Sequence, residues 1–214
     1  MTKLASKSVR CGSCRASSEH TVLLSTNAFG SPDLDLRPPG MERSTMDTWL
    51  QLCPKCGYCA PDLSQPPPDP AVLRSEVYRA ALRAAEFPEL ARRFLAFAVA
   101  AGPSDPATAA LAYLQAAWVC DDAGQPEQAV ESRRQSAAWF RRCKPFAATS
   151  HGAVMGAILV DVLRRSGQFA EASSECQAAL ASPGATGVIR KVLEFQQRLI
   201  GGSDAGPHSL SECE

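Results

Sequence analysis

Two short cysteine motifs, CGSC at Cys11–Cys14 and CPKCG at Cys53–Gly57, decide how the rest of the chain is interpreted. Each motif places two cysteines three positions apart on one tight turn, and 38 residues separate the inner cysteines of the two motifs. Two such turns facing each other supply four thiolates, the tetrahedral ligand set of a structural zinc site. The spacing therefore predicts a metal site formed by Cys11, Cys14, Cys53 and Cys56.

Residues beside these cysteines favour a metal over other thiol chemistry. Gly12 would give the first turn access to positive φ, Pro54 fixes φ in the second, and Gly57 follows the last thiolate where the backbone doubles back. Backbone amides of both turns are expected to hydrogen-bond the sulfurs. Iron is an alternative to zinc, because the second turn resembles the knuckles of rubredoxins as well as those of zinc ribbons. Disulfides or a redox C-x-x-C pair are further alternatives, although no βαβ pattern accompanies the motifs.

Two more residues could take part in metal binding. Cys59 follows Cys56 at the same spacing and could replace Cys53 or Cys56 as a ligand, but we expect a small buried thiol instead. His20 could also act as a stand-in ligand. Because both cysteine pairs are already complete, we expect it to be a surface or strand-edge histidine.

The composition is that of an ordinary globular protein. Of 214 residues, 45% are hydrophobic, and 22 cationic residues balance 22 acidic ones, so bulk charge favours neither nucleic acid nor an anionic membrane. No apolar stretch is long enough to cross a bilayer, and the first ten residues lack the apolar core of a secretory signal. Nine cysteines without such a signal predict a cytoplasmic protein.

Residues 1–62 are predicted to form a zinc-ribbon-like β head. His20–Thr26 and Met46–Leu52 have strand-like patterns, and a long polar loop with three prolines, 27–40, connects them. Two acidic residues in this loop, Asp33 and Asp35, are expected in a solvated turn, because no further acidic residues complete a cation site.

The remainder of the chain is predicted to be helical. A proline-rich linker at 63–70 precedes about seven helices within 71–200, and 201–214 is small and polar enough to be a disordered tail. The turns at Ala123–Ala129 and Ser166–Ala172 share a Gly-Gln pattern, with their glycines 43 residues apart. This pattern is typical of tetratricopeptide-like helix pairs, and the fold class is therefore mainly α; a plain alanine-rich helical bundle is the alternative.

The chain resembles a bacterial family of unknown function in which a head with two C-x-x-C motifs precedes a tetratricopeptide-like tail. The resemblance rests on this order of parts and on the stretch from Cys11 to about Leu63. It implies a bacterial cytoplasmic protein with a zinc site and no assigned activity.

The sequence favours a binding or scaffold protein that holds an unidentified protein partner on its helical array. We expect no enzymatic activity, because four thiolates leave zinc no open position and no phosphate loop, His-Glu-x-x-His motif or nucleophile elbow is present. The alternative is nucleic-acid binding by the zinc head and a basic face. That face comprises Arg133, Arg134, Arg141, Arg142 and Lys144. The same arginines, like Arg164 and Arg165, could instead complement helix dipoles.

Overall fold

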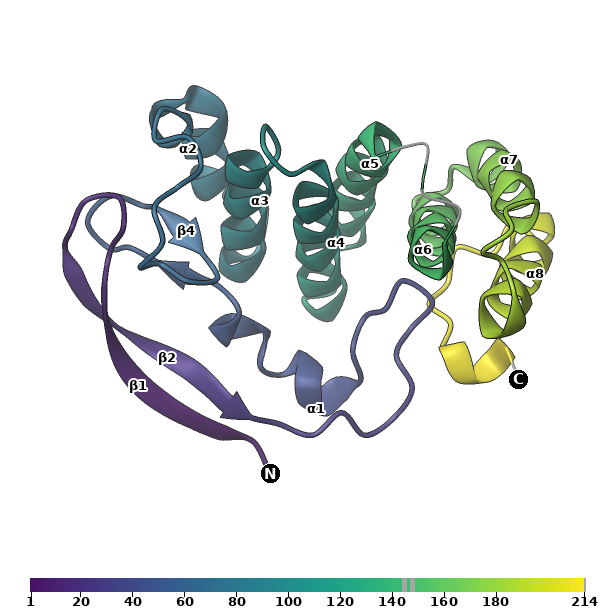
Figure 1. Cartoon of the computed structure of the whole chain (residues 1–214), viewed down its shortest axis with the longest axis horizontal. Coiled ribbons are helices and arrows are strands. Elements are labelled where there is room, and N and C mark those ends of the chain that lie inside the picture. Colours follow the sequence, from purple (N-terminus) through teal and green to yellow (C-terminus); the bar gives the residue numbers. More distant parts are fainter. Residues whose placement is uncertain (144–145, 147–148, 214) are drawn as a thin grey trace.

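The computed structural model describes residues 1–143, 146 and 149–213, and it is mainly α with a small β head, as predicted (Figure 1). The N-terminal part contains β1 (Lys3–Arg10), β2 (Ser17–Ser25), α1 (Gly40–Arg43), the 3-10 helix η1 (Met46–Thr48), β3 (Gln51–Leu52) and β4 (Cys59–Ala60). The helical part contains η2 (Val72–Arg74), α2 (Glu76–Arg83), α3 (Glu89–Ala101), α4 (Pro106–Asp122), α5 (Pro126–Arg142), α6 (Ser150–Arg165), α7 (Phe169–Leu180), α8 (Gly187–Gly201) and η3 (Leu210–Cys213).

The head consists of two antiparallel hairpins, β1–β2 and β3–β4. The strand predicted at His20–Thr26 is confirmed by β2, whereas its partner β1 was not predicted. The strand predicted at Met46–Leu52 is wrong except for its last two residues, because η1 occupies Met46–Thr48. Met46 and Leu50 are both buried against the helices, and their spacing of four fits a helical turn rather than an alternating strand.

The helices α2 to α8 confirm the seven helices predicted for 71–200. Gly124 and Gly167 have φ of 66° and 74°, and each ends one helix so that the next can pack back against it, α5 on α4 and α7 on α6. The sequence predicts that Asp69-Pro70 caps the first of these helices; in the structure α2 begins only after Ser75, whose hydroxyl accepts the Tyr78 N–H. The sequence pattern predicts a fifth helix over roughly 147–165, and its first residue, Ala147, lies outside the described residues.

Part of the N-terminal region packs in the main core with the helices, while the residues around the cysteine turns form a small cluster of their own. Leu34, Met46, Leu50 and Cys59 from the N-terminal part pack in the same cluster as residues of α3 to α8. Figure 1 shows why: after β2 the chain runs along the lower side of the helical row as far as α6 and then returns through α1 towards the head. The long loop predicted at 27–40 is therefore a packed part of the body.

The proline-rich stretch contradicts the picture of a free spacer at 63–70. Leu63 is fully buried, and its carbonyl accepts the Gly12 N–H at 2.8 Å. The backbone of Gln65 lies so close to Gly12 that an added Cβ there would be 2.4 Å from the Gln65 carbonyl oxygen. At least residues 63–65 thus belong to the head, since they lie against its first cysteine turn.

The prediction of a disordered tail at 201–214 is also corrected for the described residues up to 213. Leu210 donates its N–H to the Pro32 carbonyl at 2.9 Å, and Leu34 donates to the His208 carbonyl at 2.9 Å. Leu210 also packs against the main core and forms the start of η3. The tail is ordered because it pairs with the long N-terminal loop, a contact between distant residues that composition alone does not reveal.

A carboxylate from the N-terminal loop lies at the centre of a buried charge cluster. Asp35 is 1% exposed, and its Oδ2 accepts hydrogen bonds from Trp118 Nε1 at 2.9 Å and Arg165 Nη1 at 3.2 Å. Arg133 Nη2 lies 3.7 Å from the same oxygen. Asp121 binds both arginines, at 2.5 Å from Arg133 and 3.0 Å from Arg165. The prediction of a solvated turn is therefore wrong for Asp35, whose partners are arginines from α5 and α6.

Charged residues of this cluster occupy equivalent positions in the two Gly-Gln repeats of the sequence. Asp121–Asp122 precede Gly124, and Arg164–Arg165 precede Gly167 at the same offset, so equivalent ends of α4 and α6 carry opposite charges. The arginine pair is buried, and Arg164 Nη2 lies 2.7 Å from Asp161 Oδ1. These arginines, which could complement a helix dipole from their place in the last turn of α6, form buried ion pairs with Asp161 and Asp121.

We predict that Asp35→Ala destabilises the fold by about 3–5 kcal/mol, the usual cost of leaving buried cations without their partner. Urea unfolding followed by far-UV circular dichroism measures the change. Asp47→Ala, at an exposed position of η1, is the matched control and should cost less than about 0.5 kcal/mol. Equal stability of the two variants would contradict the central role of Asp35.

The tail also supplies a pH-dependent contact. Both ring nitrogens of His208 lie near carboxylates, Nδ1 at 2.9 Å from Glu212 and Nε2 at 3.0 Å from Asp204. Burial lowers the pKa of His208, but the hydrogen bonds to Glu212 and Asp204 outweigh it and leave the pKa above its usual value of about 6.5. The charged imidazolium donates to both acids, so this stabilisation is complete below pH ~6.5 and is lost as pH rises through the raised pKa.

We therefore predict that His208→Gln reduces stability most at acidic pH. The difference in free energy of unfolding between wild type and variant should be largest below pH ~6.5 and should shrink at higher pH. A native-state NMR titration of the His208 ring gives the pKa directly. A midpoint below ~6.5, or a difference in stability that grows with pH, would contradict the assignment.

Candidate metal centre

The first cysteine motif is the turn of the β1–β2 hairpin. Cys11 donates its N–H to the Ala16 carbonyl at 2.8 Å, and the Arg15 N–H returns to the Cys11 carbonyl at 2.9 Å. Arg15 adopts φ of 63°, a left-handed conformation that is unusual for a residue with a side chain. The hairpin thereby presents two sulfurs from one tight turn.

The second motif repeats this geometry at the β3–β4 hairpin. Cys53 donates to the Tyr58 carbonyl at 2.8 Å, and the Gly57 N–H returns to the Cys53 carbonyl at 2.9 Å. Gly57 has φ of 74°, as expected from its place after the last cysteine. Gly12 is not among the glycines with positive φ; it is needed because Gln65 passes too close for a side chain. The position matching Gly57 in the first motif is Arg15.

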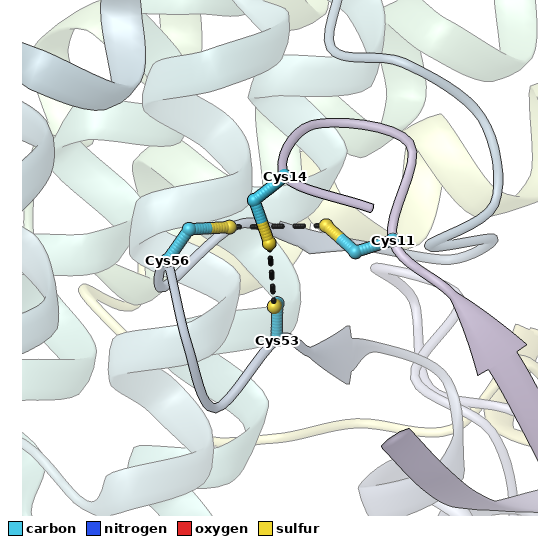
Figure 2. A group of neighbouring side chains, drawn as sticks. All are labelled: Cys11, Cys14, Cys53 and Cys56. Atoms are coloured by element: carbon cyan, nitrogen blue, oxygen red, sulfur yellow. Dashed lines mark hydrogen bonds between the residues drawn. The ribbon is translucent and has the colours of Figure 1, made fainter. Parts of the chain in front are cut away.

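The two turns bring the four predicted cysteines together. Their sulfurs all lie within 4.8 Å of one another. The Cys11 and Cys56 sulfurs are 3.7 Å apart, and those of Cys14 and Cys53 are 3.6 Å apart. Figure 2 shows the four side chains converging from two opposed turns. All four cysteines are free, so no disulfide joins them.

These distances fit a tetrahedral metal ion. Zn–S bonds of ~2.3 Å in a tetrahedron place sulfurs about 3.8 Å apart. The observed separations of 3.6 and 3.7 Å between facing sulfurs are close to this value. The site can therefore hold a metal ion; the geometry alone does not distinguish zinc from iron, since both accept four thiolates.

Backbone hydrogen bonds polarise the sulfurs, as predicted for amides of the two turns. A backbone hydrogen bond from Ala16 lowers the pKa of Cys14 to about 7. Burial raises the pKa of Cys11, although backbone hydrogen bonds from Cys14 and Ser13 act to lower it. Burial likewise raises the pKa of Cys56 to about 12, although a backbone hydrogen bond from Tyr58 acts to lower it. Four thiolates this close repel one another, and a divalent cation is the group that offsets their charge.

Cys59 and His20 lie outside the sulfur cluster. Cys59 is fully buried in the main core, where burial raises its pKa to about 12, and it is the small buried thiol that we expected. His20 lies in β2, where its Nε2 is 2.8 Å from the Ser18 hydroxyl. Of the cysteines and histidines in the described chain, only the four predicted ones form such a group.

Tyr78 connects the second cysteine turn to the helices, a role that sequence reasoning missed. Its hydroxyl donates to the Gly57 carbonyl at 2.9 Å and accepts the Cys59 N–H at 3.0 Å. The side chain is almost fully buried. A lone tyrosine in a helix gives no sequence signal for this contact, because the hydroxyl reaches a turn that lies 21 positions earlier.

The basic face considered for nucleic acid is incomplete. Arg133 is 2% exposed and binds Asp121, so it cannot contact a phosphate. Arg134 and Arg141 are exposed, and Arg142 stacks over Trp139 with 4.1 Å from its guanidinium carbon to the ring centroid. Lys144, the last member of that face, lies outside the described residues.

No family model matches the chain, and no curated protein or solved structure matches it either. The structure itself shows four clustered cysteines followed by a mostly helical tail. Among the described residues, no helix is both long enough and apolar enough to cross a membrane.

We predict near-stoichiometric metal in the purified protein and loss of most of it in Cys14→Ser and Cys53→Ser, because three sulfurs leave the tetrahedron open. Elemental analysis measures the metal content and identifies the ion. Cys59→Ser is the matched control within the same motif and should retain metal. Full metal content in Cys14→Ser, or its loss only in Cys59→Ser, would contradict the four-cysteine assignment.

Proposed function

We propose that the protein is a cytoplasmic zinc-binding interaction module without catalytic activity, in which the metal fixes the head and the helical array holds a protein partner. The observation that carries the proposal is the set of four cysteine sulfurs within 4.8 Å of one another, with two facing pairs at 3.6 and 3.7 Å. Such a set leaves no position for a substrate or an activated water, so the ion is structural. Free cysteines throughout the described chain fit a reducing compartment.

The head needs this metal because its own core is small. The buried residues around the site are Val9, Cys11, Cys53, Tyr58, Ala60 and Leu63. Few apolar side chains and two short hairpins provide little stability by themselves, and small folds of this kind depend on a metal or disulfides. Zinc is the preferred ion, since thiolate ligands select it and its tetrahedral geometry matches the site; iron is the minor alternative.

The N-terminal loop covers one side of the helical array and leaves another side open. The covered side contacts Leu34 and Asp35, and Figure 1 shows the loop below the helices. A groove of about 600 Å³ lies between α2 and α5 and contains no residue of 27–50. Its apolar lining includes Val77, Phe87 and Tyr113. We assign the partner to this groove.

Small side chains suit the groove to a partner helix. Ala80, Ala81 and Ala84 line its α2 side, and alanines let a second backbone approach closely. Glu131 and Gln135 form the rim on α5, where Gln135 Nε2 donates to Glu131 Oε1 at 2.9 Å. An apolar floor with a polar rim is the usual anatomy of a protein interface.

We predict that the metal-loaded protein captures a protein from a lysate after nuclease treatment and retains it at moderate salt. Val77→Glu should greatly reduce this capture, because it places a charge in the apolar groove; Val77 is 66% exposed, so the change should not unfold α2. The capture is quantified by mass spectrometry of the eluted proteins.

Val188→Glu is the matched control, since Val188 is a valine of α8 with 69% exposure that lies outside this groove. It should capture as much partner as wild type. Recovery of nucleic acid alone, lost steeply as salt rises, would overturn the proposal in favour of nucleic-acid binding, because counterion release makes phosphate contacts salt-sensitive.

A further inference from the structure

The strand β1 is paired on one side only. Within the described chain its ladder neighbour is β2, and the sheet contains no third strand. Most of its side chains are exposed, and Figure 1 shows the β1–β2 hairpin at the periphery of the molecule. β2 lies nearer the body, where it contacts η1. Alternate N–H and C=O groups of β1 therefore face solvent along its outer edge.

The free edge of β1 is already fixed by contacts within the chain. Val9 packs into the small core of the head, and the hairpin ends in the cysteine turn at Cys11. The eight residues of β1 span about 27 Å of extended backbone. A preorganised edge of this length loses little conformational entropy on binding, which favours addition of a strand.

The charge on this hairpin is one-sided, although the whole chain is neutral. Residues 1–26 contain four cationic residues, Lys3, Lys7, Arg10 and Arg15, and a single acidic one, Glu19. Lys3 and Lys7 project from the same face of β1, because side chains two or four positions apart share a face in a strand. Neither lysine makes a salt bridge within the described chain, although Lys7 acts on the Asp62 carboxyl at longer range and lowers its pKa. The edge thus presents net positive charge beside unpaired backbone groups.

The positive charges of the hairpin favour one class of ligand for the β1 edge over others. Pairing β1 with a second copy would bring the lysines and Arg10 of both chains into one seam, and like charges opposite each other destabilise a sheet. A nucleic-acid strand would meet the positive charge but has no regular row of donors for the β1 carbonyls. An extended peptide with carboxylates on one face matches both the charge and the backbone groups.

We propose that the outer edge of β1 binds an extended acidic segment of a partner protein, which adds to the β1–β2 hairpin as a third strand. Carboxylates four positions apart in that segment lie opposite Lys3 and Lys7. The proposal rests on the proposed interaction function and adds a second contact surface with a defined ligand chemistry. It does not involve the groove between α2 and α5.

The test uses the metal-loaded full chain and a fluorescent peptide of eight residues, the length of β1, in which valine and glutamate alternate. Fluorescence anisotropy should report binding, and hydrogen exchange should show added protection of β1 amides. The double variant Lys3→Glu/Lys7→Glu should weaken binding at least about tenfold, through loss of attraction and new repulsion. A peptide N-methylated at alternate residues along one edge should not bind, because it lacks the donors that a new strand requires.

The control Arg134→Glu/Lys191→Glu makes the same change in net charge at two exposed positions of α5 and α8. It should bind within about twofold of wild type, since distant exposed charges are screened. The proposal is overturned by equal binding of the N-methylated peptide, by no binding of the acidic peptide, or by preference for oligothymidylate. Val77→Glu separates the two surfaces: it should abolish capture at the groove and leave peptide binding unchanged.

Discussion

The contact between Asp35 and the arginines of the helical array determines how the N-terminal part lies on the body. A buried carboxylate is unfavourable unless charged partners surround it, and Asp35 has a partner in Arg165 from α6, with Arg133 of α5 close by. Trp118 of α4 completes the set with its indole N–H. Because these three helices supply the partners together, the loop has one position in which the charge is satisfied. With Asp35 in this position, its apolar neighbour Leu34 packs in the main core.

A second ion pair strengthens the same arrangement. Arg37, two residues after Asp35, pairs with Asp122 at the end of α4, and Arg43 Nε lies 3.4 Å from the other oxygen of that carboxylate. Asp122 is more exposed than Asp35, so its ion pairs contribute less to stability. They mainly hold the segment that carries Arg37 and Arg43 against the end of α4. The face of the array that would otherwise be open is occupied by the chain itself. The groove and the hairpin edge, the two surfaces that we propose for interaction, lie outside this covered face.

The sequence predicted the features that depend on local spacing. The cysteine turns, the seven helices and the Gly-Gln turns follow from residues that are close together in the chain, and all are present. The role of Asp35 could not be predicted in this way, because its partner Arg165 lies 130 positions away and a loop carboxylate is usually solvated. One signal did exist: the 43-residue repeat places Asp121–Asp122 and Arg164–Arg165 at equivalent helix ends, and Asp121 does pair with Arg165. The identity of the partner that we propose has no comparable signal, because it would belong to another molecule.

The metal site and the charge cluster restrain one and the same loop. Closing the 38 residues between Cys14 and Cys53 costs on the order of 4 kcal/mol in chain entropy. Once a metal ion closes this loop, Asp35 near its middle has far fewer positions to explore, and docking it among the arginines costs less. The reverse holds as well: docking of Asp35 brings the two cysteine turns towards each other and favours metal binding. The separation of a metal-binding head from a helical body is thus a feature of the sequence pattern, whereas in the folded protein the two ends of the loop and its centre stabilise one another.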